Sequence, residues 1–214
     1  MVQVKQYQLP PTALMPNSPR PLLHYTGVPL PQPLTASAVY DLFERHGWNV
    51  QWIYRYGATQ RSHYHSSVHE CMAVLSGTAT IRFGVGDTST DLIESTTGSA
   101  REPGGVEIEA RAGDVFLLPA GTAHKTYNAK PDAEFTLLTP GDGHHIAAHD
   151  PRAALDDVQL SGFTMIGAYP ANNGYWDSMK GGENAGQYDK IWSVEKPEND
   201  PVLGKSEQGL CGLW

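Results

Sequence analysis

From Trp48 onward, apolar and polar side chains alternate in short runs that are typical of β-strands. The run WNVQWIYRY, residues 48–56, places large apolar side chains at every second position, which predicts a strand with all of them on one face: Trp48, Val50, Trp52, Tyr54 and Tyr56. Similar runs predict strands within 70–77, 78–85, 105–113, 114–121, 124–130, 134–140 and 162–170. Short turns with Gly or Pro separate most of these runs. Several short strands in succession predict an all-β fold, either a sandwich or a barrel.

Helical spacing is confined to the flanks of this β-rich region. Three apolar residues three and four positions apart follow a candidate N-cap at Thr35 or Ser37, which predicts a short helix within 35–48 that ends near Gly47. A second short helix is expected within 145–158. The stretch 86–105 is polar and rich in Gly, Ser and Thr, and it predicts a long mobile loop.

These patterns divide the chain into three parts. Residues 1–47 form an N-terminal arm, rich in Pro and Leu up to residue 33, and the short helix, both packed on a barrel. Residues 48–170 form the β-barrel itself, and residues 171–214 form an irregular C-terminal extension. Three tryptophans are expected to anchor this extension on the barrel: Trp176, Trp192 and Trp214.

Composition and charge exclude several classes of function. The chain has 214 residues and a net charge of −8, without a basic stripe for nucleic acid or a polybasic patch for a membrane surface. It has no apolar run of the roughly 20 residues that a membrane-spanning helix needs. The N-terminus does not resemble a signal peptide, and two cysteines are too few for a disulfide framework. We therefore expect a protein of the reducing cytoplasm.

A first candidate for chemistry is the stretch HYHSSVHE, residues 63–70. His63 and His65 are two positions apart, so on a strand both rings project from one face. Glu70 follows after four residues, past a predicted kink at Ser66–Ser67, and glycines 57 and 77 frame the segment. Two imidazoles and a carboxylate suit a divalent first-row transition metal.

A second segment, GDVFLLPAGTAHKTYN, supplies a further imidazole. Gly113 is followed at fixed spacing by a Pro-x-Gly turn, by His124 and by Asn128. If the two segments lie opposite each other in a barrel, His124 completes a set of three histidines and one glutamate. One or two positions on the metal would then stay open for water, substrate or dioxygen.

The two segments match both motifs of the cupin superfamily, G-x5-H-x-H-x4-E-x6-G and G-x5-P-x-G-x2-H-x3-N, at all ten fixed positions. Since no residue type exceeds about a tenth of average sequence, chance does not explain this match. Outside the motifs the chain resembles the YjlB-like branch, through IGAYP, a later Trp-Asp pair and DPVLGK near the end. The linker between the motifs, 78–112, is longer than the family's usual one.

The resemblance implies a jelly-roll barrel, a double-stranded β-helix of the RmlC-like type, with a few short peripheral helices. It also implies one divalent transition-metal ion inside the barrel and a homodimer. Carried over residue by residue, the metal ligands are His63, His65, Glu70 and His124.

Other histidines near the motifs have two interpretations each. Strand alternation turns His69 away from the face of Glu70, which favours a structural or outer role, and the alternative is that it replaces Glu70 as a ligand. His144, His145 and His149 could form a second metal site, but their spacing favours a solvated loop.

Tyr54 and Arg82 are the candidate catalytic residues among the side chains that could reach the pocket. Core packing, or for Arg82 a surface ion pair, is the alternative for each. The remaining candidates are Tyr56, Arg61, Tyr64 and Tyr127.

Three neutral imidazoles and one carboxylate leave a divalent ion with a net charge of about +1, which favours a small anionic or chelating substrate. Iron or manganese would permit dioxygenase chemistry, which we slightly favour. Zinc or nickel would permit isomerase, lyase or decarboxylase chemistry by Lewis-acid polarisation. A small-molecule binding protein with a structural metal is the alternative from another class.

Overall fold

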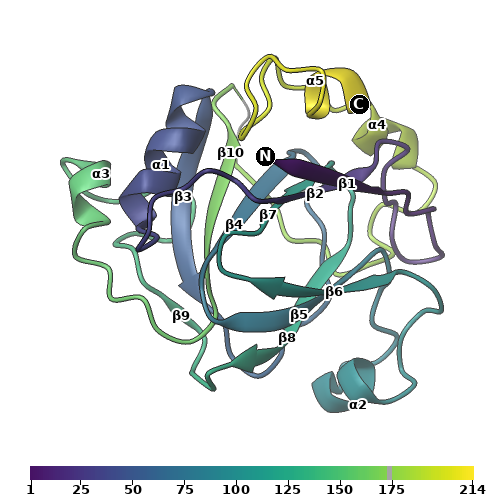
Figure 1. Cartoon of the computed structure of the whole chain (residues 1–214). Helices are drawn as coiled ribbons and strands as arrows, with labels where there is room; N and C mark the ends of the chain where they lie inside the picture. The colour runs from purple at the N-terminus through teal and green to yellow at the C-terminus, as the bar shows by residue number, and fades with distance from the viewer. Residues whose placement is uncertain (173–174) are drawn as a thin grey trace.

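Two antiparallel sheets face each other in the computed structural model of the chain, which describes residues 1–172 and 175–214 (Figure 1). The strands of the described residues are β1 (Gln3–Tyr7), β2 (Leu22–Thr26), β3 (Trp48–Arg55), β4 (Glu70–Ser76), β5 (Thr78–Phe83), β6 (Val106–Arg111), β7 (Val115–Leu118), β8 (His124–Lys130), β9 (Thr136–Leu137) and β10 (Thr164–Pro170). The helices are α1 (Ala36–Arg45), α2 (Leu92–Thr97), α3 (Pro151–Ala154), α4 (Tyr188–Trp192) and α5 (Leu210–Leu213).

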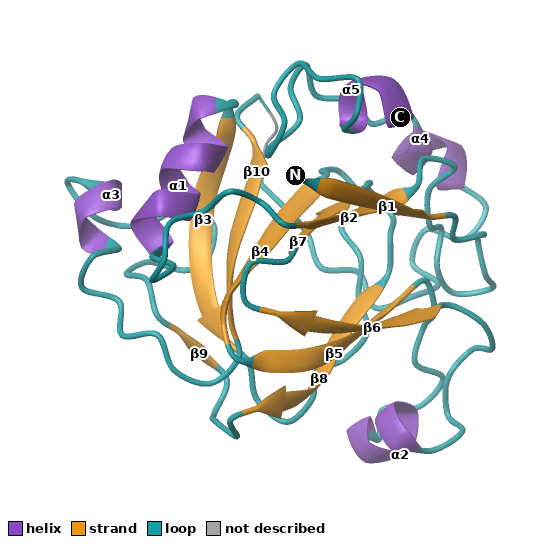
Figure 2. Cartoon of the chain, in the orientation of Figure 1, coloured by secondary structure: helices purple, strands orange, loops and turns teal. Residues whose placement is uncertain are grey.

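The strands divide into a large and a small sheet. The large sheet has the order β1-β2-β7-β4-β10-β3-β9, and the small sheet has the order β6-β5-β8. All helices lie at the periphery of these sheets (Figure 2). This confirms the predicted all-β class with a few short helices, and the arrangement fits the jelly-roll barrel that the resemblance implies.

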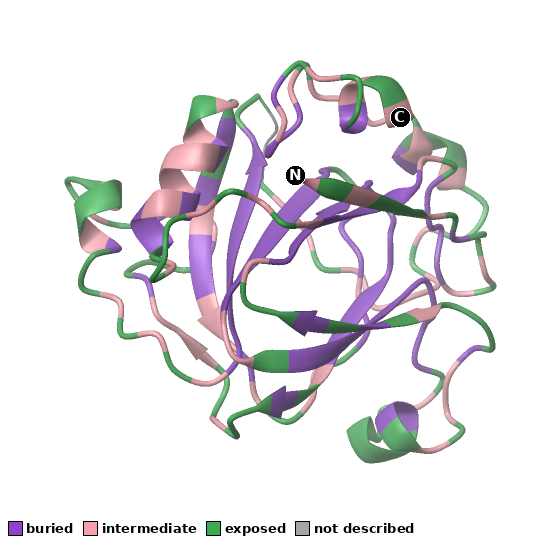
Figure 3. Cartoon of the chain, in the orientation of Figure 1, coloured by how far each residue is buried: buried purple, intermediate pink, exposed green. Residues whose placement is uncertain are grey.

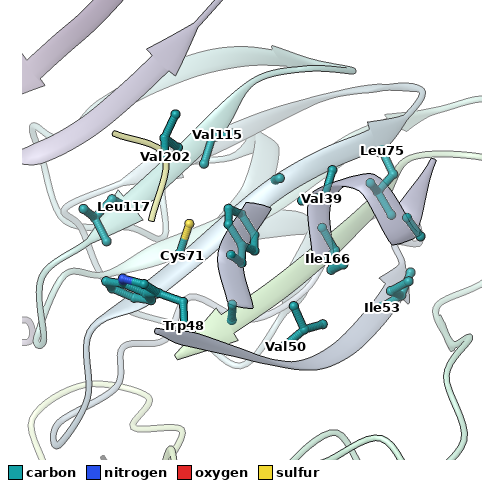
Figure 4. Packing of buried hydrophobic residues seen from close by; sticks show 14 of the residues in the cluster. Val39, Trp48, Val50, Ile53, Cys71, Leu75, Val115, Leu117, Ile166 and Val202 are labelled. Carbon is teal, nitrogen blue, oxygen red and sulfur yellow. The ribbon is translucent and has the colours of Figure 1, made fainter. Parts of the chain in front are cut away.

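The large sheet separates two hydrophobic cores. The inner core lies between the two sheets and includes Met72, Ile81 and Phe116. The outer core lies between the large sheet, α1 and the C-terminal segment, and it includes Val39, Cys71, Ile166 and Val202 (Figure 4). Strands β4 and β10 are therefore buried on both faces along nearly their whole length (Figure 3). Such strands have continuous apolar runs instead of alternation.

Helix α1 begins and ends where the sequence predicts. Thr35 is the N-cap, and its side-chain oxygen accepts a hydrogen bond from the backbone N–H of Ala38. Gly47 follows the last turn at a φ of 79°, a conformation that glycine adopts without strain. Val39 and Phe43 are fully buried, so the apolar face of α1 closes the outer core.

The prediction that residues 48–56 present one apolar face is wrong, because a β-bulge divides strand β3. Gly167 of β10 pairs with Trp52 of β3 and Ala168 pairs with Val50, so Gln51 has no partner on β10. The extra residue reverses which side chains point to which face of the sheet. As a result, the outer core receives Trp48 and Val50, and the inner core receives Trp52 and Tyr56.

The N-terminal arm does more than cover the surface. Its two strands join the large sheet, since β1 pairs with β2 and β2 pairs with β7. Strand β2 has the sequence LLHYT and is buried over most of its length. Because its apolar run is short and does not alternate, the sequence pattern did not identify it as a strand.

The stretch 86–105 contains a helix, α2, where only a mobile loop is predicted. Asp91 caps this helix by accepting two backbone N–H hydrogen bonds at 2.9 and 3.1 Å. Helix α2 covers the outer face of the small sheet. The carbonyls of Ser95 and Thr96 accept from the guanidinium of Arg82 in β5, and the Ser95 hydroxyl accepts from Lys125 in β8. The pattern misses α2 because the helix has only six residues, three of them Ser or Thr.

The C-terminal segment packs on the barrel through the predicted tryptophans. The indole N–H groups donate to backbone carbonyls of distant residues: Trp176 to Gly143, Trp192 to Asn17 and Trp214 to Pro21. Helices α4 and α5 interrupt the stretch that is predicted to be irregular, and residues 173 and 174 of that stretch lie outside the described residues. None of the helices in the described part of the chain has both the length and the apolar character to cross a membrane.

Asp200 holds this segment to the outer core. Its side chain is fully buried, and it accepts hydrogen bonds from the Tyr25 hydroxyl and from the backbone N–H groups of Val202, Leu203 and Leu210. A buried carboxylate is stable only when it is satisfied in this way.

We predict that Asp200→Ala lowers the free energy of unfolding by about 3 kcal/mol, because the substitution leaves several buried donors without an acceptor. Denaturant titration measures this change. Asp157→Ala is the matched control, since Asp157 is exposed, and it should change stability by less than about 0.5 kcal/mol. Equal stability of the two variants would contradict this role of Asp200.

Candidate metal centre

Three histidines from the two sequence motifs converge at one end of the barrel. His63 and His65 lie in the segment between β3 and β4, and His124 opens β8. The backbones of His63 and His124 form an antiparallel bridge, with N–H to carbonyl distances of 3.1 and 2.8 Å. One potential ligand atom from each of the three side chains lies within 4.8 Å of the others, which is close enough for all three to bind one ion.

Glu70, the first residue of β4, lies beside this group. Its Oε1 is 3.1 Å from Nε2 of His65 and accepts a hydrogen bond from the Tyr169 hydroxyl at 2.7 Å. Its Oε2 is 3.4 Å from Nε2 of His124, and this buried oxygen accepts no hydrogen bond from the residues that the structure describes. A buried carboxylate oxygen that accepts no hydrogen bond and faces an imidazole cluster is typical of a metal ligand.

Burial and charge set the protonation of the cluster. Burial, together with the charges of the neighbouring histidines, holds the pKa of His63 well below its usual value. Burial lowers the pKa of His124 to about 4 against the opposing effect of Glu70. Burial would raise the pKa of Glu70, but His65 and His124 outweigh it and lower this pKa. At neutral pH the site thus holds a carboxylate and at least two neutral imidazoles.

His65 differs from the other two histidines. Burial would lower its pKa, but the charge of Glu70 and hydrogen bonds with Glu70 and the Asp177 carbonyl outweigh burial and raise it. When His65 is protonated it forms a buried ion pair with Glu70, and a bound cation would replace this proton.

The outer nitrogen of each imidazole is near a backbone carbonyl. Nδ1 of His63 is 3.1 Å from the carbonyl of Arg61, and Nδ1 of His124 is 3.3 Å from that of Thr122. Nδ1 of His65 bonds the carbonyl of Asp177. Such carbonyls fix the tautomer and direct Nε2 toward a metal. The donors, their orientation and the orphaned Glu70 oxygen all fit one divalent transition metal.

Asp177 is a contact that the sequence did not predict. Its carboxylate accepts from the backbone N–H and the hydroxyl of Ser66, within the segment that carries His65. The predicted kink at Ser66–Ser67 is thus held from the C-terminal extension. Ser66 and Asp177 are 111 positions apart, so no local pattern predicts their contact. The only sign of it in the sequence is the Trp-Asp pair that the chain shares with the YjlB-like branch.

Tyr169 is the second functional residue that sequence reasoning missed. Its hydroxyl donates to Glu70 and accepts from the indole N–H of Trp52 at 3.1 Å. Gly167 permits this arrangement, because a Cβ there would lie 2.1 Å from the Trp52 ring. Tyr169 lies on β10, which is buried on both faces, so its alternation pattern cannot show which side chains face the site.

A cavity of about 220 Å³ opens beside the cluster. Aromatic side chains form most of its wall, and polar groups lie at its edge; the lining residues beyond the four candidate ligands are Trp52, Tyr54, Tyr56, Gln60, Arg61, Phe135, Tyr169, Trp176, Ser178 and Lys180. Tyr54, Tyr56 and Arg61 are thus brought to the site. An aromatic cavity with a few polar groups is typical of a small-molecule site.

Arg82, a predicted catalytic residue, is not brought to this cavity. Its guanidinium lies under α2 on the outer face of the small sheet, where it bonds Glu107 at 2.8 Å and the carbonyls of Ser95 and Thr96. The alternative interpretation, an ion pair, therefore describes this residue. The Tyr127 hydroxyl accepts a hydrogen bond from the Arg82 guanidinium at 3.3 Å, and the Tyr64 hydroxyl donates to Asn184. Neither of these two tyrosines lines the cavity.

His69 faces away from the cluster, as strand alternation predicts. Its Nδ1 accepts from the backbone N–H of Ala120 at 2.9 Å, and its Nε2 lies 3.2 Å from the guanidinium of Arg20. These contacts join the segment before β4 to the turn before β8. His69 therefore has a structural role and does not replace Glu70.

The three histidines near residue 145 do not form a second cluster of the kind described above within the described residues. His144 stacks on Trp176 with ring centroids 4.2 Å apart, and His145 pairs with Asp142 at the surface. His149 is exposed. The favoured interpretation, a loop, holds for two of them, and His144 instead packs over the wall of the cavity.

Comparisons with known proteins agree with this fold. The sequence model of a family described as Cupin matches residues 41–157. The uncharacterized protein YjlB of Bacillus subtilis (strain 168) is 26% identical over 219 residues, and the match covers 99% of this chain and 97% of that protein.

Solved structures give weaker matches. An oxalate decarboxylase of Lactobacillus farciminis in complex with formate has a TM-score of 0.31 and 12% identity, over 90% of this chain and 42% of that chain. Hazelnut (Corylus avellana) vicilin has a TM-score of 0.27 and 12% identity, over 58% of this chain and 22% of that chain. The chain thus spans less than half of either protein, and scores this low carry no argument about activity.

We predict that His63→Ala and His124→Ala each lower metal affinity by more than about 100-fold, since changes to outer contacts alone cost 10–100-fold. Chelator competition followed by mass spectrometry measures the affinity and the metal content. His149→Ala is the control, because His149 is exposed and lies outside the cluster. Full occupancy in either ligand variant would remove that residue from the set.

We also predict that metal binding releases protons, because the pKa of His65 is raised above its usual value of about 6.5. Only neutral imidazole binds a metal, so affinity is highest above this pKa and falls as the pH drops through it. At pH 6.5 more than about half a proton should leave per ion bound. Calorimetry in buffers of different ionisation enthalpy measures this number, and a value of zero at this pH would show that His65 is neutral without metal.

Proposed function

This chain belongs to the cupin family, and on that premise we propose that it is a metal-dependent enzyme that acts on a small anionic or chelating organic compound. The single observation that carries this proposal is the convergence of three histidines and a buried glutamate at the wall of an aromatic cavity. The resemblance to YjlB extends over nearly the whole chain, so the barrel and its C-terminal extension are both part of the proposed enzyme.

Four residues would hold the metal: His63, His65, Glu70 and His124. A bound divalent ion would supply Lewis acidity and, as iron or manganese, redox capacity. The three imidazoles and one carboxylate also fit zinc or nickel, because ligand type alone does not select one metal.

The rest of the chain prepares the site for an anion. Three neutral imidazoles and one carboxylate compensate only one charge of a divalent ion. Arg61 and Lys180 add positive charge at the edge of the cavity. The aromatic walls lower the local dielectric constant, which strengthens the attraction between these charges and an anionic substrate. Tyr54, half-buried and stacked on Phe135, is the candidate that would contact the substrate through its hydroxyl.

Tyr169 and Trp52 support Glu70. The Tyr169 hydroxyl donates to Oε1, whereas Oε2 accepts no hydrogen bond from the described residues, so Oε2 is the oxygen more available to a metal. The indole of Trp52 in turn fixes the direction of this hydroxyl. These contacts hold the carboxylate in one orientation without using the cavity itself.

Within this class we favour a dioxygenase over an isomerase, lyase or decarboxylase. Iron or manganese, which this donor set accommodates along with zinc and nickel, would supply the redox capacity that a dioxygenase needs. A binding protein with a structural metal is the remaining alternative, and the homodimer that the resemblance implies stays a prediction.

Metal analysis of the untagged protein, purified without chelator, tests the proposal. We expect near-stoichiometric iron or manganese, and oxygen uptake that depends on an added diketone, catechol or hydroxy acid. His124→Ala is the negative control for uptake. Full metal with turnover in the absence of oxygen would instead establish isomerase or lyase chemistry, and protein without metal or turnover would contradict the proposal.

A further inference from the structure

A second hollow adjoins the cavity of the metal centre. Its volume is about 560 Å³, and Arg61 and Lys180 line both spaces. Arg101 adds a third cation to its wall. The barrel supplies Arg61 from the segment just before His63, and the C-terminal extension supplies Lys180. The two hollows therefore meet at a pair of cationic side chains.

The two carboxylates of this second hollow are already engaged. Asp87 forms an ion pair of 3.0 Å with the buried Lys125 and accepts from the backbone N–H of Ser62. Glu102 accepts three hydrogen bonds, from the Thr12 hydroxyl and from the backbone N–H groups of Leu14 and Gly86. Neither carboxylate forms an ion pair with the cations of the hollow.

The cations themselves have capacity for an anion. Among the described residues, the guanidinium of Arg61 has no hydrogen bond or ion pair, while its backbone carbonyl orients His63. The Lys180 ammonium donates to the Ser178 hydroxyl at 2.6 Å. Arg101 is held by the carbonyl of Gly98 at 2.8 Å through one nitrogen of its guanidinium. An ammonium or guanidinium can donate several further hydrogen bonds to carboxylate or phosphate oxygens.

Lys180 lies in a positive environment. Burial, and then the like charge of Arg61, lower its pKa, and its charge in turn contributes to the lowered pKa of His63 and His124. Glu183 is an acidic residue next to Lys180. Its carboxylate accepts the backbone N–H groups of Lys180 and Gly181 and is exposed, so it offsets the cations only in part.

We infer that the substrate carries two anionic groups, one at the metal centre and a second, a carboxylate or a phosphate, between Arg61 and Lys180. This inference rests on the proposed function for the first group and on the shared wall of the two hollows for the second. Arg61 and Lys180 then select substrates by their far end. A compound with one anionic group fills the aromatic cavity but leaves this pair of cations without a partner.

Calorimetric titration with matched probes tests this inference. The probes are succinate and glutarate, their half-amides succinamate and glutaramate, and phosphonoacetate as a phosphate-like end. In the manganese-loaded protein at least one dianion should bind about 10-fold or more tightly than a half-amide, as expected for a charge-assisted contact of about 1.4 kcal/mol. Preference for phosphonoacetate over the dicarboxylates would identify the far group as a phosphate.

The double variant Arg61→Gln/Lys180→Gln should bind each dianion and its half-amide with equal affinity. Arg111→Gln/Lys205→Gln removes the same charge from two exposed positions outside both hollows, and it should keep the preference. Three results would each overturn the inference. The native protein could show no preference for dianions, the Arg61→Gln/Lys180→Gln variant could keep it, or the Arg111→Gln/Lys205→Gln control could lose it.

The same titration without metal separates this inference from the proposed function. The cations do not depend on the metal, so in the metal-free protein a dianion and its half-amide should both bind through one carboxylate, and this binding should be lost in Arg61→Gln/Lys180→Gln. A protein that binds no metal but still binds these anions through Arg61 and Lys180 would contradict the proposed enzyme and leave the anion site intact. A protein that binds metal and shows no preference for dianions would contradict this inference and leave the proposed enzyme intact.

Discussion

The buried charge of Glu70 is the constraint on which the rest of the site depends. A carboxylate that is 2% exposed at the edge of a hydrophobic core is stable only with partners that compensate its charge and its hydrogen bonds. His65 and Tyr169 satisfy one oxygen, and the other oxygen faces His124 without a hydrogen bond. A cation among the three histidines would complete this set. The Tyr169 hydroxyl accepts from the indole N–H of Trp52, which β3 presents beside its bulge, and the lack of a Cβ at Gly167 leaves room for this ring.

The sequence predicted the parts of the molecule that local patterns control. Most barrel strands, helix α1 and its N-cap Thr35 follow from periodicity and capping, and they lie where expected. The convergence of His63, His65 and His124 follows from two motifs at fixed spacing, although the ligand roles themselves stay a prediction. Strand alternation also placed His69 on the opposite face from the site. In each case neighbours within a few residues carry the information.

Other features depend on contacts between distant parts of the chain, and no local pattern reports them. At the bulge in β3, Gln51 has no partner between Gly167 and Ala168 of β10. Trp52 and Tyr56 therefore lie in the inner core, on the opposite face from the one that simple alternation predicts. Arg82 of β5 is a predicted pocket residue, but its guanidinium bonds the carbonyls of α2, a helix from a stretch with no clear helical pattern. Asp177, Lys180 and Tyr169 reach the site only because the chain returns to the barrel after residue 160.

X-ray absorption spectroscopy of the metal-loaded protein tests the central claim most directly, because the multiple scattering of imidazole rings counts the histidine ligands of the bound ion. We expect three imidazole ligands in the native protein, two in His124→Ala, and a changed ligand shell in Glu70→Gln, where a neutral amide replaces the carboxylate. Fewer than three imidazoles, or a spectrum that neither substitution changes, would show that the ion binds elsewhere and that Glu70 is a structural carboxylate.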